Sequence, residues 1–305
     1  MRKVAVLAVL VGVTLGVGAK MNMGLAGAPG GWGGRTVQSP AASEIVRSSK
    51  NSAELEQAAS ALARSRDPRD LTLLGQLLRD GGFLARLDDP SGLRTFHLSK
   101  VMETLAAHPS RKTAELCLTL ADDPVFLAED DRKGLLLVAL AAVRPMSDRT
   151  AAVFQRTNEE GYFAFNAPLL AANGTPIALN LFESMMLDRK VPIARRMDGV
   201  HASIVPHRIN LRILRVADLI LLHTSERALT IGVIESVFDF RPQWFGTESR
   251  LSGPPPWQNA RADSLRFALT LAETAAARPG LEPSLRRAVV HARETIVQTL
   301  GPRPK

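Results

Sequence analysis

The chain has almost none of the residues that cross-link small extracellular proteins, because Cys117 is the single cysteine among its 305 residues. A disulfide-rich framework is therefore excluded, and so is a lipid-anchored exported form, which needs a cysteine near the N-terminus. The 22 glycines follow no period, which excludes a collagen-like chain. Cys117 lies on the apolar face of a predicted helix, where a lone thiol is typical of a small core residue.

The sequence also has little that favours β-strands. It contains one tyrosine and 11 phenylalanines, and alternating runs of β-branched residues are nearly absent. From about Ala53 onward apolar residues instead recur every three or four positions, as at Leu71, Leu74 and Leu78. This pattern predicts an all-α fold, an α-solenoid or superhelical array of about six antiparallel helix pairs. The predicted pairs are 53–64 with 68–79, 93–107 with 110–122, 132–143 with 147–157, 162–172 with 175–187, 208–223 with 225–238, and 260–277 with 282–300.

Several of these pairs share a phrase in which a leucine and small residues precede a turn proline. The phrase occurs at 105–109, 140–145 and 170–176, with looser versions before Pro68 and Pro279. A helix-pair repeat of this length is typical of α-solenoids. Between 53 and 300 the chain resembles the HEAT-like repeat family, whose characteristic turn residues are matched in part by Asp67, Arg111 and the pair at 148–149. The resemblance implies a stacked, curved binding scaffold and no chemistry. Other helical repeats and an irregular helical array remain open.

The N-terminus predicts an exported protein. Arg2 and Lys3 precede an apolar run at 4–18, and small residues precede Lys20, as in a cleaved secretory signal at 1–19. An uncleaved membrane anchor is the alternative. Either version places the protein in the periplasm or outside the cell. We expect a flexible linker at 20–52, rich in Gly, Ala and Ser, then a repeat domain at 53–300 and a tail at 301–305. Insertions are expected at 80–92, 123–131, 188–207 and 239–259.

Basic residues concentrate in one part of the chain. The net charge is only +8, from 38 basic and 30 acidic residues, which does not favour a nucleic-acid-binding protein. Residues 189–215, however, hold seven basic residues and a single acid. Arg208, Arg212 and Arg215 are predicted to share one helix face, and Arg195 and Arg196 precede them. This cluster is a candidate site for an acidic protein or peptide, an anionic envelope glycan or a lipid headgroup. The alternative is a solvated helix face that is neutralised by acids at 122–131 or by Asp218.

Aromatic residues form a second candidate site between 238 and 257. This segment holds Phe238, Phe240, Trp244, Phe245 and Trp257. Three consecutive prolines, at 254–256, directly precede Trp257. Aromatic faces near arginines suit peptide or sugar recognition, and Trp244 and Trp257 are predicted to supply apolar contacts beside the arginine row. The alternative is that these rings fasten a long insertion to the helices.

No catalytic motif accompanies these clusters. The sequence has no nucleophile elbow, no phosphate-binding loop and no paired-histidine metalloprotease helix. His201, His207 and His223, with Asp198, match no zinc-ligand spacing, so no metal or cofactor is expected. Asp239 and Glu248 lie in the aromatic segment, and two carboxylates are what a glycosidase uses. The prediction is therefore a non-catalytic binding or scaffold protein, with an envelope glycan-binding or glycan-cleaving enzyme that uses loop 238–257 as the alternative.

Overall fold

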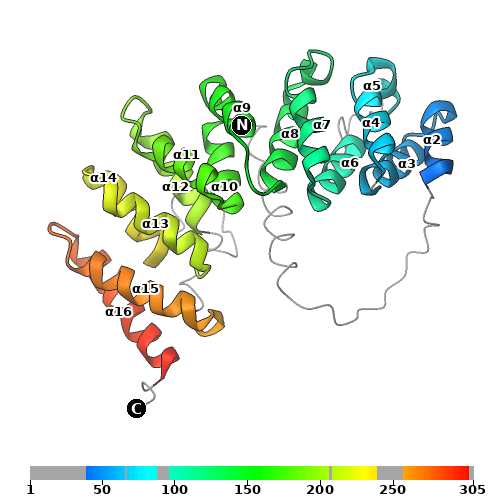
Figure 1. Cartoon of the computed structure of the whole chain (residues 1–305). Coiled ribbons are helices and arrows are strands. Elements are labelled where there is room, and N and C mark those ends of the chain that lie inside the picture. The colour runs from blue at the N-terminus through cyan, green and yellow to red at the C-terminus, as the bar shows by residue number, and fades with distance from the viewer. Residues whose placement is uncertain (1–38, 66, 88–95, 206–207, 239–256, 302–305) are drawn as a thin grey trace. The chain divides into compact units, whose positions relative to one another are not determined.

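A computed structural model describes residues 39–65, 67–87, 96–205, 208–238 and 257–301, and these residues form helices and turns without a strand (Figure 1). The all-α fold class predicted from the sequence is confirmed. The predicted signal segment at 1–19, most of the linker and the C-terminal tail lie outside the described residues. None of the described helices is long and apolar enough to cross a membrane.

The chain divides into two compact units, with the boundary between Arg156 and Thr157. The described helices of unit 1 are α2 (Ser39–Ser48), α3 (Ser52–Arg64), α4 (Pro68–Leu77), α5 (Gly81–Leu87), α6 (Phe96–Ala107), α7 (Arg111–Leu120), η1 (Phe126–Ala128), α8 (Asp130–Ala142) and α9 (Asp148–Thr157). Unit 2 contains η2 (Asn158–Tyr162), α10 (Phe163–Asn173), α11 (Pro176–Leu187), α12 (Ile193–Ile204), α13 (Leu211–His223), α14 (Arg227–Phe238), η5 (Trp257–Asn259), α15 (Ala262–Ala276) and α16 (Pro283–Leu300).

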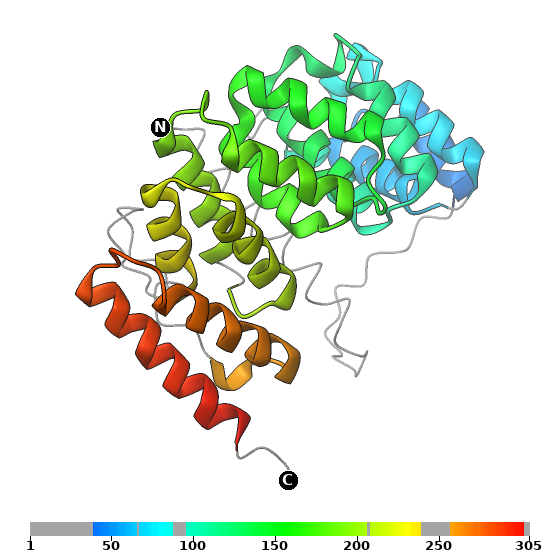
Figure 2. The same cartoon turned by 60° about the vertical axis from the view of Figure 1, so that its left-hand side comes forward.

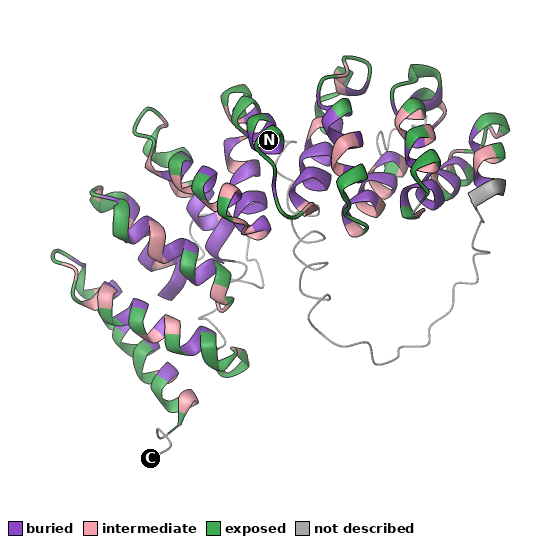
Figure 3. Ribbon diagram, in the orientation of Figure 1, coloured by how far each residue is buried: buried purple, intermediate pink, exposed green. Residues whose placement is uncertain are grey.

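Unit 1 packs its helices in two layers. One layer runs from α3 to α6 to α8, and α4 and α7 pack together in the other. Leucines form much of the core between them, including Leu55, Leu62, Leu74 and Leu98, which are all fully buried. In α8 every residue from 134 to 141 is buried, which fits a helix that is apolar on all sides (Figure 3).

The end of the predicted linker is a helix. Residues 39–48 form α2, and Ala42 and Val46 are fully buried against its neighbour α3. The side chain of Arg86 on α5 donates to the carbonyl oxygens of Val46 and Ser49, which end α2. The helical array therefore begins before Ala53, because two small apolar positions and one capping arginine suffice to dock a short helix whose sequence is otherwise polar.

Unit 2 also has two layers, and it contains one helix, α12, that the predicted pairs lack. Helices α10, α12, α14 and α16 pack successively in one layer, while α11, α13 and α15 form the other. In Figures 1 and 2 the orange α15 and the red α16 lie side by side. Helix α12 occupies the segment 188–207 that was predicted to be an insertion. It packs on α10, α14 and α13, while the predicted pairs of 208–223 with 225–238 and of 260–277 with 282–300 are present as α13 with α14 and α15 with α16.

Two of the turn prolines begin the second helix of a pair, as the repeated motif predicts. Pro68 and Pro176 are the first residues of α4 and α11, where a missing N–H costs nothing. The small residues before them let helices approach: Ala167 and Ala171 of α10 are fully buried. Gly174 ends α10 in the left-handed conformation, with φ of 64°.

Candidate functional site

The predicted basic cluster is divided between the two ends of helix α13. At one end, the guanidinium of Arg196 on α12 pairs with Glu226, which follows α13. At the other end, Arg212 in the first turn of α13 donates to the carbonyl oxygens of Ala172 and Asn173, at 3.0 and 3.4 Å. Residues 212 and 223, near the two ends of α13, are separated by about 16.5 Å along the helix axis, at 1.5 Å per residue. Neighbours in the sequence are therefore distant in space.

Arg208, Arg212 and Arg215 do not form one exposed row. Arg208 precedes α13 and is 5% exposed, and desolvation lowers the pKa of its guanidinium to about 10, which leaves it charged at neutral pH. Arg212 is exposed but caps the end of α10, where a Cβ on Gly174 would overlap its side chain. Arg215 alone points to solvent without a hydrogen bond or ion pair within the described part of the chain. The predicted apolar face opposite them is present, since Ile213, Val216 and Ile220 are buried.

Arg196 is a structural residue rather than an exposed binding residue. It is 2% exposed and donates to the carbonyl oxygen of Val191 at 3.0 Å and to that of Met186 at 3.3 Å, besides its pair with Glu226. The hydrogen bond from Arg196 lowers the pKa of the Glu226 carboxyl. Its neighbour Arg195 is about 100° around α12 from it and is exposed.

Three successive turns of unit 2 meet at one edge of its layers, where hairpins join α11 to α12, α13 to α14 and α15 to α16 (Figure 1). We call residues 188–196, 224–227 and 278–282 the turn edge. Arg189 donates to the Ser225 hydroxyl at 2.6 Å, and Arg227 donates to the carbonyl oxygen of Gly280 at 3.1 Å. Arg278 donates to the carbonyl oxygen of Leu221 at the end of α13. These contacts hold consecutive turns against one another.

The turn edge carries a net positive charge on exposed side chains. It contains six basic and three acidic residues, a net charge of +3. Arg189, Lys190, Arg195 and Arg227 are all exposed. The turns that join these helices contain much exposed chain, which is green in Figure 3. The N-termini of α12, α14 and α16 lie at the same edge, and neither Pro192 before α12 nor Glu282 before α16 caps them through a side chain. Their backbone N–H groups add to the positive potential.

The sequence indicates only part of this edge. Arg189, Lys190 and Arg195 belong to the predicted cluster, but Arg227 and Arg278 lie well beyond its last residue, Arg215. Arg227 and Arg278 could have been predicted from their positions in the sequence, because each lies in or next to the turn of a predicted helix pair.

The described aromatic residues of the segment 238–257 are part of the core. Trp257 is 2% exposed, and its ring centroid lies 6.4 Å from that of Phe238, at the end of α14. The segment η5 that carries Trp257 also packs on α16. Trp257 therefore anchors the segment η5 to α14 and α16. Its ring is buried and offers no free face to a ligand. Trp244, together with Phe240, Phe245, Asp239 and Glu248, lies outside the described residues.

The histidines and the cysteine take structural positions. His201 is buried, its Nδ1 lies 2.8 Å from the Ser236 hydroxyl, and desolvation lowers its pKa to about 4. His223 contacts the Glu183 carboxylate on the neighbouring helix α11. Burial raises the pKa of the Cys117 thiol to about 12. Across the described ranges, no three His, Cys, Asp or Glu side chains converge in the way a metal ion requires.

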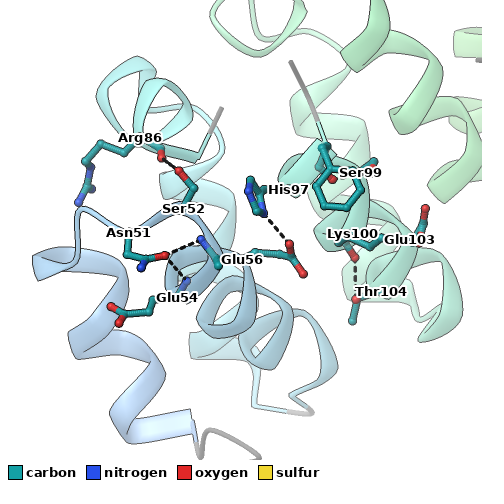
Figure 4. Close-up of polar contacts among 12 residues, drawn as sticks. Asn51, Ser52, Glu54, Glu56, Arg86, His97, Ser99, Lys100, Glu103 and Thr104 are labelled. Atoms are coloured by element: carbon teal, nitrogen blue, oxygen red, sulfur yellow. Dashed lines mark hydrogen bonds and ion pairs between the residues drawn. The ribbon is translucent and has the colours of Figure 1, made fainter. Parts of the chain in front are cut away.

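Unit 1 uses a similar bridge between successive helices of one layer. The Nδ1 of His97 on α6 lies 2.6 Å from a carboxylate oxygen of Glu56 on α3 (Figure 4). Asn51 caps α3 by accepting from the backbone N–H groups of Ala53 and Glu54. These contacts fix the stacking of the first helices.

No family model, curated protein or solved structure matches this chain. What the helices present on their surfaces must therefore be interpreted from their own residues.

Proposed function

We propose that this is a non-catalytic binding or scaffold protein, and that the turn edge of unit 2 binds an acidic segment of a protein partner. The observation that carries the proposal is the excess of basic residues on three adjacent turns. Of these residues Arg196 is neutralised by Glu226, whereas Lys190 and Arg195 extend into solvent. The HEAT-like repeat class and the export of the protein through residues 1–19 belong to the same proposal.

The chemistry of the turn edge favours an acidic polypeptide. Guanidinium groups bind carboxylates through two parallel hydrogen bonds, and several basic groups spread over three turns match a segment with several acids. An exposed ion pair contributes only about 0.2–1 kcal/mol, so affinity requires several pairs at once. Such binding weakens as the ionic strength rises, because salt screens exposed charges over about 8–10 Å.

A binding role agrees better with the described residues than a catalytic one. Ser236 and His201 make a serine–histidine contact, but both side chains are buried, and the hydroxyl donates to the carbonyl oxygen of Gly232. Substrate could not reach this hydroxyl without opening the packing of α12 on α14. The glycan-cleaving alternative depends on residues outside the described part of the chain, and the two described aromatic residues of its segment, Phe238 and Trp257, pack against each other.

The proposal is tested with a fluorescein-labelled peptide of eight glutamates, whose binding to the full chain is followed by fluorescence anisotropy. The variant Lys190→Glu/Arg195→Glu reverses two exposed charges of the turn edge. Arg215→Glu is the matched control, because Arg215 is also exposed but lies outside the turn edge, about 12 Å before the end of α13. We expect roughly tenfold weaker binding for the double variant at low salt and less than a twofold change for the control. Equal losses in both variants would mean that the peptide senses net charge rather than this edge.

A further inference from the structure

Few large apolar side chains are exposed on the described helices, and two of them lie at or beside the turn edge. In the described ranges six such residues are exposed, namely Phe96, Val125, Ile193, Leu222, Val290 and Val297. Ile193, which is 38% exposed, belongs to the turn edge, and Leu222, which is 60% exposed, lies two residues before its segment 224–227. A single apolar residue on a surface needs no explanation. Two of them beside one group of basic side chains form a mixed apolar and basic surface.

Ile193 lies between two exposed cations in the first turn of the edge. It follows Lys190 by three residues and precedes Arg195 by two. Its neighbours Pro192 and Ala194 are exposed as well. A short apolar step therefore separates two positive charges along the chain, and all of these side chains reach solvent.

The acids of the turn edge leave these two charges available. Glu226 is paired with the buried Arg196, and Asp188 accepts the backbone N–H of Lys190 at 2.9 Å. The third acid lies on the last turn, directly before α16. Arg196 also donates to the carbonyl oxygen of Val191 at 3.0 Å, which fixes the backbone at the start of α12. The first turn is therefore preformed, and a partner need not order its backbone on binding.

Leu222 extends the apolar surface to the second turn. It is the last residue but one of α13, and its side chain is the most exposed of the six. The carbonyl oxygen of the preceding residue, Leu221, accepts a hydrogen bond from Arg278, which places the end of α13 beside the third turn. Apolar and basic side chains thus occur together on more than one turn of the edge.

We infer that the turn edge selects an acidic segment with apolar residues between its carboxylates, and that Ile193 and Leu222 contact those apolar residues. This inference rests on the proposed function and adds to it the class of segment that is recognised. A segment of carboxylates alone would bring charges over Ile193, where they lose water and gain no hydrogen-bond donor. A leucine-sized side chain at that place instead removes apolar surface from water on both partners. The basic residues then supply the charge attraction, and the two apolar residues supply the selectivity.

The test compares two fluorescein-labelled peptides of equal charge by fluorescence anisotropy with the full chain. One is Gly-Glu-Glu-Glu-Leu-Glu-Glu-Glu-Gly, and the other has serine in place of the central leucine. We expect the leucine peptide to bind roughly fivefold more tightly, because its side chain is partly buried on the edge. Higher salt should weaken both peptides but keep the ratio of their affinities, since salt screens ion pairs and not the apolar contact.

A double variant identifies the residues that are responsible. Ile193→Ser/Leu222→Ser should reduce the preference for the leucine peptide to less than about twofold. Both side chains are exposed, so we expect a folded protein, which circular dichroism and the unfolding temperature check. Val297→Ser is the matched control, because Val297 is 47% exposed but lies about 21 Å along α16 from its first residue, next to the turn edge. The control should keep the full preference.

Equal affinity of the two peptides for the wild-type chain would overturn the inference. It would leave the proposed function intact if Lys190→Glu/Arg195→Glu still weakened both peptides, whereas a failure of both peptides to bind would overturn the two together. A leucine preference that survives in folded Ile193→Ser/Leu222→Ser would equally contradict the inference, because other residues would then make the contact. If the double variant does not fold, Leu222→Ser and Ile193→Ser are measured singly, and an undiminished preference in both would have the same meaning.

Discussion

The ion pair between Arg196 and Glu226 is expected to be the strongest single polar contact in unit 2. Glu226→Ala would leave a guanidinium that is 2% exposed with only the carbonyl oxygens of Val191 and Met186. Removing one partner of a fully buried pair costs about 3–5 kcal/mol. Because the Glu226 side chain is 30% exposed and water reaches its carboxylate, we expect about 2–3 kcal/mol.

The assay should report on unit 2 alone. In a background with Trp32→Phe and Trp244→Phe, fluorescence comes from Trp257, which packs within unit 2. Urea unfolding of Glu226→Ala in this background should show the expected decrease in the free energy of unfolding. In thermal unfolding, the unfolding temperature should fall by about 5–10 °C.

Two further variants decide whether the buried charge is responsible. Arg196→Met/Glu226→Leu removes both charges and should recover most of the stability, because an apolar pair of similar volume replaces the ion pair at little cost. Glu103→Ala is the comparison, because it breaks an ion pair with the exposed side chain of Lys100. It should change the free energy of unfolding by less than about 0.5 kcal/mol. A loss below 0.5 kcal/mol in Glu226→Ala would refute the reasoning.

Three other predictions follow from the core and the helix ends. Because burial lowers the pKa of His201 to about 4, below the value of 6.5 in the unfolded chain, the unfolded state takes up the proton first as the pH falls. The free energy of unfolding should therefore fall by roughly 3 kcal/mol as the pH is lowered from 6.5 to 4. His201→Gln should flatten this part of the stability–pH curve. An unchanged curve would count against the assignment. Cys117 should react with a thiol reagent only on unfolding, so rapid labelling of the native protein at pH 8 would show that its site is open. Gly174→Ala should lower stability by about 1–2 kcal/mol in denaturant titrations, because it combines a left-handed backbone with an overlap on Arg212; Gly280→Ala, also at positive φ but with open space around it, is the control that shows the backbone effect alone.

The sequence predicted the helices whose buried positions are apolar. The predicted segments 53–64 and 162–172 differ from α3 and α10 by one residue at their ends. Helix α12 escaped prediction because its buried face is made of Arg196, Gly199, His201 and Ser203 as well as Val200 and Ile204. Each polar member has a partner in the structure, such as Glu226 for Arg196 and Ser236 for His201, and a periodicity of apolar residues cannot reveal such partners.

The candidate site was predictable in composition but not in geometry. The excess of basic residues at 189–215 is visible in the sequence, whereas the reversal of the chain between α12 and α13 separates Arg195 from Arg212 and Arg215. Arg227 joins the turn edge only because the next hairpin returns to the same side, where its guanidinium reaches Gly280.

The abundance of arginine has a structural explanation in these helix ends. Side chains on α5, α9, α12 and α13, and one after α15, donate to carbonyl oxygens in the last turn of another helix, as at Ala121, Ala172 and Leu221. Carbonyl groups at a helix C-terminus lack intrahelical donors, and a cation there also complements the helix dipole. The donors are Arg86, Arg156, Arg196, Arg212 and Arg278. Five of the 38 basic residues therefore stabilise the stacking of helices, and two of these five, Arg196 and Arg278, belong to the turn edge.

The most direct test of the binding role is capture of partners by the tagged full chain from cell-envelope and soluble fractions, with identification by mass spectrometry. Wild type, Lys190→Glu/Arg195→Glu and Arg215→Glu are compared at equal amounts of folded protein. The turn-edge proposal predicts a protein with an acidic segment that is recovered with wild type and Arg215→Glu and is lost with the double variant. Recovery of the same proteins with all three would contradict it.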